Sequence, residues 1–225
     1  MRTIIMNVFD IIGPIMIGPS SSHTAGAVRM GRVAWKILGE DAIKADISLI
    51  GSFAMTYKGH GTDKALIAGI LGMKPDDLRI PRSLDIAKES GLMYTFSLKK
   101  IANAHPNTAI LKLYGKNGAK CTVEGVSIGG GNIQITKLNG MEAAFNGEKD
   151  TLIIPHDDKP GAVAAVTSHL AKFNVNIGNF RLTRQRKNQL AIMTIELDSM
   201  IEKNVVQGIR ELDGIVSVVY MHPAQ

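Results

Sequence analysis

The sequence has few cysteines, few aromatic residues and no long apolar run, and each shortage excludes a class of protein. Cys121 is the only cysteine among 225 residues, so an internal disulfide framework is excluded and a reducing compartment is expected. No apolar run reaches the roughly 18 to 20 residues of a membrane-spanning helix, and residues 1–4 lack a full signal-peptide pattern. We therefore expect a cytoplasmic protein with no membrane partner.

The charge of the chain is basic but is not arranged for nucleic acid. The net charge is +6, from 26 basic and 20 acidic residues, and the chain has four tyrosines and one tryptophan. The basic residues are dispersed, and no recognised nucleic-acid-binding motif is present. An anionic substrate or an acidic partner surface accounts for the excess of positive charge, so we expect no nucleic-acid partner.

A cluster of hydroxyl residues precedes the first long helical pattern. Apolar positions at helical spacing predict a helix over 27–38 with Gly39 as its stop, and a shorter helix is expected over 8–12. The cluster, within the segment 18–26, therefore lies at a helix N-terminus, where unpaired N–H groups and the helix dipole favour a carboxylate or phosphate. N-capping by a single hydroxyl is the alternative. The members of the cluster are Ser20, Ser21, Ser22, His23 and Thr24.

Two further histidines lie in polar loops. His60, in Gly59-His60-Gly61-Thr62-Asp63, precedes a short helical pattern that ends at Gly72, and Thr62 or Asp63 is the expected cap. His105, in His105-Pro106-Asn107-Thr108, interrupts two strand-like runs. Three histidines in loops suggest a shared polar cleft. No metal site is predicted, because apart from Asp63, three residues after His60, no second carboxylate or histidine follows these histidines at i+3 or i+4 spacing.

The remaining patterns of the first 148 residues predict a mixed α+β domain. Alternation predicts a strand over 47–55, and Ser83 is the expected cap of a helix over 84–90. Further strands are predicted over 92–101, 108–114, 119–128 and 132–138. The first and second are joined through 105–107, and the second and third by a hairpin at Asn117-Gly118.

A second domain is predicted over 151–225, after a short polar linker. Its pattern is β-α-β-β-α-β, the order of a ferredoxin-like unit. The strands are expected at 151–155, 176–184, 190–197 and 216–221, and the helices at 162–173 and 200–212.

The three motifs of the first domain, in this order and at these separations, resemble the beta chain of the bacterial iron-sulfur-dependent L-serine dehydratases (L-serine ammonia-lyases). The resemblance covers essentially the whole chain. It implies a catabolic, gluconeogenic enzyme that converts L-serine to pyruvate and ammonia. A separate alpha chain would carry the [4Fe-4S] cluster, and this chain would be inactive without it.

The resemblance also implies site residues. It assigns substrate contact or proton transfer to the hydroxyls of residues 20–24, to His60, Thr62, His105 and Asn107. Histidine titrates near neutrality, so His60 and His105 are candidate bases or proton donors, with His60 preferred for its place between two glycines at a helix start. His23 is expected to orient the serine cluster. Cys121 is expected to be structural, because a [4Fe-4S] cluster takes three or four cysteinates.

The second domain resembles an ACT domain, a type that pairs edge to edge and binds an amino acid at the interface. His156, Pro160 and Gly161 match the serine-binding loop of the related domain in phosphoglycerate dehydrogenase. This chain has Asp158 at the position where that loop has an asparagine. An aspartate there would repel a carboxylate but could accept from an ammonium group. The candidate effector residues are His156, Asp158, Gly161 and Asn176, and dimerisation alone is the alternative.

A non-catalytic function is the rival hypothesis. Both domains resemble those appended to some phosphoglycerate dehydrogenases, so the chain could instead be an amino-acid-sensing regulatory subunit that binds serine. The motifs around His60 and His105 favour the enzyme, because sensing a carboxylate does not require them.

Overall fold

The computed structural model describes residues 15–184, 186, 187 and 189–223, so the helix expected over 8–12 lies outside the described residues. The chain divides after Gln134 into two compact units. The first sheet of the structure ends at residue 145 and the second begins at residue 150. The predicted division into domains 1–148 and 151–225 stays a prediction.

The hydroxyl cluster begins a continuous helical segment. η1 (Ser21–Gly26) is a π-helical turn that leads directly into α2 (Ala27–Leu38). Gly39 ends α2 with φ 77°. The predicted helix over 27–38 and its glycine stop are confirmed, and the apolar positions of α2 face the core.

The first strand ends earlier than its alternation predicts. β1 (Ala42–Gly51) is followed by α3 (Ser52–Thr56), so the prediction of a strand through residue 55 is wrong. Gly51 has φ 64° and ψ −128°, a conformation that glycine adopts without a steric penalty, and it turns the chain. Phe53 is buried while Met55 is 80% exposed, so the apolar alternation continued past the end of the strand.

α4 (Thr62–Ile70) crosses α2 with almost no space between the two backbones. Its N-cap is Gly61, at φ 69°, so the expected cap at Thr62 or Asp63 is wrong, and the left-handed glycine makes the turn instead. A Cβ atom added at Gly69 would lie 2.1 Å from the carbonyl oxygen of Val28, and one added at Gly31 would lie 2.4 Å from that of Leu66. The two glycines allow this close approach.

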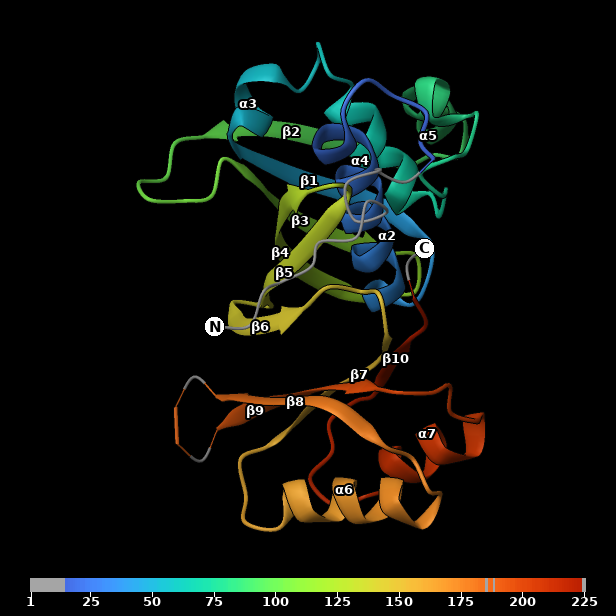
Figure 1. Cartoon of the computed structure of the whole chain (residues 1–225), viewed down its shortest axis with the longest axis vertical. Helices are drawn as coiled ribbons and strands as arrows, with labels where there is room; N and C mark the ends of the chain where they lie inside the picture. The colour runs from blue at the N-terminus through green and yellow to red at the C-terminus, as the bar shows by residue number, and fades with distance from the viewer. Residues whose placement is uncertain (1–14, 185, 188, 224–225) are drawn as a thin grey trace, which may run out of the picture. The chain divides into compact units, whose positions relative to one another are not determined.

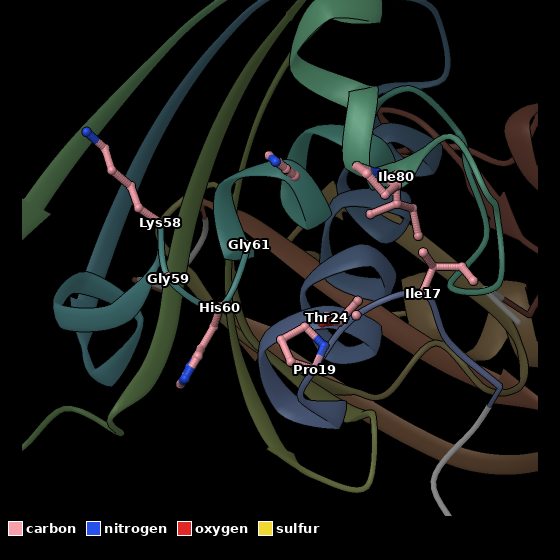
Figure 2. A pocket seen from close by; sticks show the side chains of 11 residues that line it. Ile17, Pro19, Thr24, Lys58, Gly59, His60, Gly61 and Ile80 are labelled. Atoms are coloured by element: carbon pink, nitrogen blue, oxygen red, sulfur yellow. The ribbon is translucent and has the colours of Figure 1, made fainter.

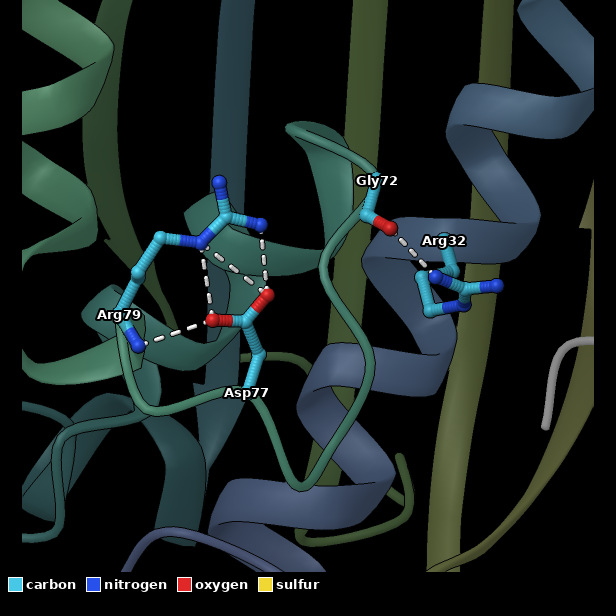
Figure 3. A network of polar contacts seen from close by, with 4 residues as sticks. All are labelled: Arg32, Gly72, Asp77 and Arg79. Carbon is cyan, nitrogen blue, oxygen red and sulfur yellow. Dashed lines mark hydrogen bonds and ion pairs between the residues drawn. The ribbon is translucent and has the colours of Figure 1, made fainter.

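A loop of turns leads from α4 to η2 (Ile80–Arg82) and α5 (Ser83–Glu89). Ser83 is the first helical residue rather than a cap, and its hydroxyl donates to the carbonyl of Lys64. The loop is held by an Arg79–Asp77 ion pair at 2.7 Å and by a hydrogen bond from the Arg32 guanidinium of α2 to the Gly72 carbonyl (Figure 3).

The first sheet has the order β2-β1-β3-β4-β5-β6, and α2 packs on β3 and β4 (Figure 1). β2 is parallel to β1, whereas β3 is antiparallel to both β1 and β4. The hairpin at Asn117-Gly118 is confirmed, but residues 105–107 join strands that are not neighbours, because β1 lies between them. β6 was missed. The strands are β2 (Met93–Lys99), β3 (Asn107–Gly115), β4 (Lys120–Gly129), β5 (Asn132–Leu138) and β6 (Met141–Phe145).

The second sheet confirms the predicted ferredoxin-like βαββαβ order and with it the α+β class. Its strand order is β10-β7-β9-β8, and the helices lie on one face of it (Figure 1). Its core joins apolar residues of the strands and both helices. The last helix and strand are shorter than expected. The elements are β7 (Asp150–Asp157), α6 (Ala162–Lys172), β8 (Ile177–Arg184), β9 (Leu190–Leu197), α7 (Lys203–Arg210) and β10 (Val219–Met221).

Within the described residues, every helix is too short or too polar to cross a membrane.

Candidate functional site

A cavity of about 220 Å³ lies where the hydroxyl cluster, the His60 loop and η2 meet (Figure 2). Its polar groups come from Thr24, Lys58, His60 and Lys64, and its apolar wall from the segments around residues 17 and 80. The full lining is Ile17, Gly18, Pro19, Thr24, Lys58, Gly59, His60, Gly61, Lys64, Ile80 and Pro81. Two of the three predicted motifs therefore share one cavity.

The apolar wall is fixed to the rest of the unit by backbone contacts. The Ile17 N–H donates to the Pro75 carbonyl at 3.0 Å, which ties the entry to η1 to the loop after α4. The Arg79–Asp77 pair then shapes the same loop just before Ile80. The cavity is thus bounded by a braced loop on one side and by helix starts on the other.

His23 is held between two hydroxyl groups. Its Nδ1 lies 3.3 Å from Ser20 Oγ, and its Nε2 lies 3.3 Å from Ser52 Oγ, while Ser20 Oγ also accepts from the His23 backbone N–H. A hydroxyl can donate or accept, so the pair of serines suits either neutral tautomer. Ser20 is the N-cap of η1, as the capping alternative requires, and the same hydroxyl contacts the imidazole.

The surroundings of His23 favour its neutral form. The side chain is 7% exposed and packs edge-on against Phe53, with ring centroids 5.1 Å apart. The His60 ring lies 4.7 Å away at 81°. Burial, and then the neighbouring His60, lower the pKa of His23 below its ordinary 6.5. His23 therefore offers one lone pair and one N–H at neutral pH.

His60 is exposed, contacts the His23 ring and lines the cavity. It lies in the loop before α4, and the side chains of Lys58 and His60 leave this loop in opposite directions (Figure 2). Lys58 and Lys64 also line the cavity. Two ammonium groups beside the N-terminus of a nine-residue helix make the region favourable to a carboxylate.

Thr24 places a buried hydroxyl against the cavity. Thr24 is 2% exposed, and its Oγ1 has no hydrogen-bond partner within the described residues. Gly18 crosses directly over it, since a Cβ at Gly18 would lie 2.2 Å from Thr24 Oγ1. A buried hydroxyl without a partner costs about 1 to 3 kcal/mol, so this position favours a bound polar group. Ser21 and Ser22 are half-buried in the first turn of η1.

Thr62 is placed differently from its predicted contact role. It is fully buried in the first turn of α4, and its Oγ1 also has no partner within the described residues. It does not line the cavity. Its side chain faces the interior of the unit in this structure.

The His105 loop lies beside α3 rather than in the cavity. The Pro106 carbonyl accepts from the Phe53 N–H at 3.2 Å, and Gly51 pairs with Asn107 in the sheet. The Asn107 N–H donates to His105 Nδ1 at 3.2 Å, so Nδ1 is an acceptor and the exposed Nε2 carries the hydrogen of the neutral ring. The Asn107 amide turns inward and donates to the Ser127 carbonyl.

Ser52 was missed by the sequence reasoning. The alternation over 47–55 placed it on a strand, whereas it is the first residue of α3 and its hydroxyl contacts His23. The signal was the Gly51-Ser52 pair at the end of an apolar run, which fits a turn into a helix as well as a strand. Ser52 connects the His23 contacts with the segment that packs on the His105 loop.

The residues described here do not form a metal centre. Cys121 is 4% exposed in β4, its thiol donates to the Ala34 carbonyl at 3.6 Å, and burial raises its pKa to about 12. Among the described residues, no three His, Cys, Asp or Glu side chains gather in a metal-binding arrangement. A [4Fe-4S] cluster does not fit the side chains of this chain.

The four candidate effector residues lie at two ends of the second sheet. His156 is 1% exposed and its Nδ1 donates to the Asp157 carbonyl at 2.7 Å, while Asp158 pairs with Arg184 at 3.0 Å and Gly161 caps α6. Asn176 lies beyond the other end of β8 and donates to Asp198. Within one chain, Asn176 therefore does not join the other three, and Arg184 offsets the charge of Asp158.

Comparisons with known proteins agree with these motifs. Residues 7–91 match the serine dehydratase beta chain family. The chain is 44% identical over 212 residues to the probable L-serine dehydratase beta chain of Bacillus subtilis (strain 168), which covers 94% of this chain and 96% of that protein. It is 37% identical over 214 residues to the L-serine dehydratase beta chain of Peptoniphilus asaccharolyticus, with 95% and 96% covered.

A more distant relative is the D-3-phosphoglycerate dehydrogenase of Archaeoglobus fulgidus, 23% identical over 199 residues, which are 87% of this chain and 37% of that protein. The first two relatives are far more similar and match over almost their whole length. This chain belongs to the serine dehydratase beta chain family.

Proposed function

We propose that this chain is the cytoplasmic beta subunit of a [4Fe-4S]-dependent L-serine ammonia-lyase, and that it binds the substrate carboxylate and moves protons at a site shared with an alpha chain. The observation that carries the proposal is the arrangement around His23. A buried imidazole held by two hydroxyls faces His60, beside a cavity lined by Lys58 and Lys64. Dehydration of L-serine requires a bound carboxylate and groups that transfer protons, and these residues are proposed to supply both.

Binding of the carboxylate is the first task of these residues. Lys58, Lys64 and the start of α4 supply positive potential at the cavity, and the buried Thr24 hydroxyl can donate to a carboxylate oxygen. Neutralising this carboxylate lowers the cost of the negative charge that builds up when the α-proton leaves. Ser21 and Ser22 lie in the same short helix, η1, and are proposed to add donors to this set.

Proton transfer is the second task. His60 is exposed at the cavity and is the assigned base for the α-proton, while His23, kept neutral by burial, supports the His60 ring without adding a second positive charge. His105 is proposed as the donor to the departing hydroxyl: as an imidazolium it would give up its exposed Nε2 proton and become the neutral ring. With the base and the acid at separate positions, no single group has to remove the α-proton and also protonate the departing hydroxyl.

The iron-sulfur cluster is assigned to the alpha chain. It would supply a Lewis acid for the hydroxyl of serine, and the single buried Cys121 cannot contribute a set of cysteinates. The chain is therefore proposed to be inactive alone.

The test is the loss of turnover in single-histidine variants of the reconstituted enzyme. His60→Ala and His105→Ala should each reduce pyruvate formation by about 10² to 10⁴-fold, the range for a lost general acid or base. His169→Gln, in α6, is the matched histidine control and should retain activity. If both variants keep a tenth or more of the activity, neither histidine takes part in the chemistry.

The amino-acid sensor is the second candidate. The likeness to a phosphoglycerate dehydrogenase over 87% of this chain favours it, because that relative carries the matching region as part of a larger protein. A sensor should bind L-serine as the isolated chain, with heat measurable by calorimetry, and should add no turnover to an alpha chain. Effector binding by the second unit, and its self-association, are parts of this proposal.

A further inference from the structure

An exposed apolar surface lies at the end of β2, next to the His105 loop. Met55 is 80% exposed, Leu98 57% and Ile101 49%, and they border a hollow of about 800 Å³. We call these three residues and the hollow the β2-end surface. The hollow is lined by Ile50, Gly51, Ala54, Met55, Leu98, Lys99, Lys100, Ile101, Ala102 and Ala104.

This surface includes the free edge of a sheet. β2 is the outermost strand of the first sheet and pairs with β1 only, within the described part of the chain. Exposed edge strands with apolar side chains attract other chains, and contiguous exposed apolar patches mark interaction sites. Lys99 and Lys100 at the end of the edge discourage pairing with a second basic chain.

The charge of the surface selects an acidic partner. Lys99 and Lys100 line it and are exposed. The segments 47–62 and 90–123, which include all of its residues, contain no aspartate or glutamate. A second copy of this chain would bring the same lysines against them, whereas a partner with apolar side chains among carboxylates would be attracted.

The surface is continuous with the candidate site. Gly51 lines it and is followed by Ser52, which contacts His23. The loop from Lys100 to Ala104 leads directly into His105, and α3 leads from Met55 to Lys58 and His60. A chain that covers this surface would be anchored on both segments that carry the assigned proton-transfer groups.

We propose that the β2-end surface is where the alpha chain docks, through a segment that presents apolar side chains flanked by carboxylates. This inference rests on the proposed function, because it takes the alpha chain as the partner that completes the site. Docking here places the partner against the segments that lead to His105 and His60.

The test compares two carboxylate substitutions on one strand. Leu98→Asp places a negative charge within the surface, whereas Met93→Asp, at a residue 64% exposed near the other end of β2, is the matched control. Affinity of the full-length chain for the alpha chain is measured anaerobically by sedimentation, at low and high salt. Leu98→Asp should weaken binding at least about tenfold, as for a central interface residue, and Met93→Asp should change it less than about twofold.

Further measurements separate docking from chemistry. Ile101→Asp should behave like Leu98→Asp and replaces it if that variant fails to fold. Lys99→Gln with Lys100→Gln should slow association and reduce its salt dependence. In the Leu98→Asp complex, pyruvate formation should recover at saturating alpha chain.

Two results would overturn the docking site. One is equal affinity of the alpha chain for wild type, Leu98→Asp and Ile101→Asp. The other is self-association of this chain that Leu98→Asp abolishes, which would identify a second copy as the occupant. A wild-type complex that forms, is weakened by Leu98→Asp and makes no pyruvate would overturn the proposed activity while supporting the docking site.

Discussion

Gly69→Ala should destabilise the first unit and disturb the candidate site together. The added Cβ would lie 2.1 Å from the Val28 carbonyl oxygen, whereas an ordinary contact begins at 3.4 Å, so α2 and α4 must separate by about 1.3 Å along this contact. Overpacking costs about 1 to 3 kcal/mol, and the better helix propensity of alanine returns about 1 kcal/mol. Because the neighbour is backbone, we expect a net loss of about 2 kcal/mol.

The assay uses the single tryptophan. Trp35 lies in α2, so its fluorescence in urea reports the unfolding of the first unit. Gly31→Ala enters the same crossing, since each added Cβ lies 2.9 Å from the Cα of the other glycine. The double variant should therefore lose less than the sum of the single losses, because the first methyl group already separates the helices.

The same variant tests how the site is held. η1, at the start of α2, carries His23 and Thr24, and α4 begins just after His60. A displacement of about 1 Å at reacting groups can reduce a rate by about 10²-fold, so Gly69→Ala should also reduce turnover of the folded, reconstituted enzyme. A variant as stable as wild type, with full activity, would refute the claim that this crossing sets the site.

Two further predictions follow from the buried groups of the first unit. The folded-state pKa of His23 is lowered, so as the pH falls the unfolded chain protonates this imidazole before the folded chain does. The free energy of unfolding should therefore decline below pH 6.5, and His23→Gln should weaken that dependence. An unchanged pH profile in the variant would contradict this prediction. Burial raises the pKa of Cys121 to about 12, so a disulfide reagent at pH 8 should label it only after unfolding in urea, and rapid labelling of the native chain would contradict its buried position.

The sequence predicted the positions of the motifs well because helix starts have local signals. The hydroxyl cluster before α2 and the loop before α4 were expected at helix N-termini, and both are found there. Asn117-Gly118 likewise forms its hairpin, because the turn needs little beyond these two residues. Signals of this kind act over a few residues.

The errors came from conformations and pairings that local patterns do not determine. Ser52 was placed on a strand because apolar alternation continued past Gly51, whose backbone ends the strand. Gly61, rather than Thr62, caps α4 because the chain arrives there in the left-handed region. β1 lies between β2 and β3, which only the tertiary fold decides. The contact of His23 with His60 joins two separate motifs and could be expected only as a shared cleft.

The most direct test of a split active site is anaerobic pyruvate formation from L-serine in three samples: this chain, a cluster-loaded alpha chain, and the two mixed. The account predicts turnover only in the mixture. This chain holds the residues around His23 and His60, but its single cysteine is buried and cannot bind the cluster. Full turnover by the alpha chain alone, or none in the mixture with the cluster intact, would contradict it.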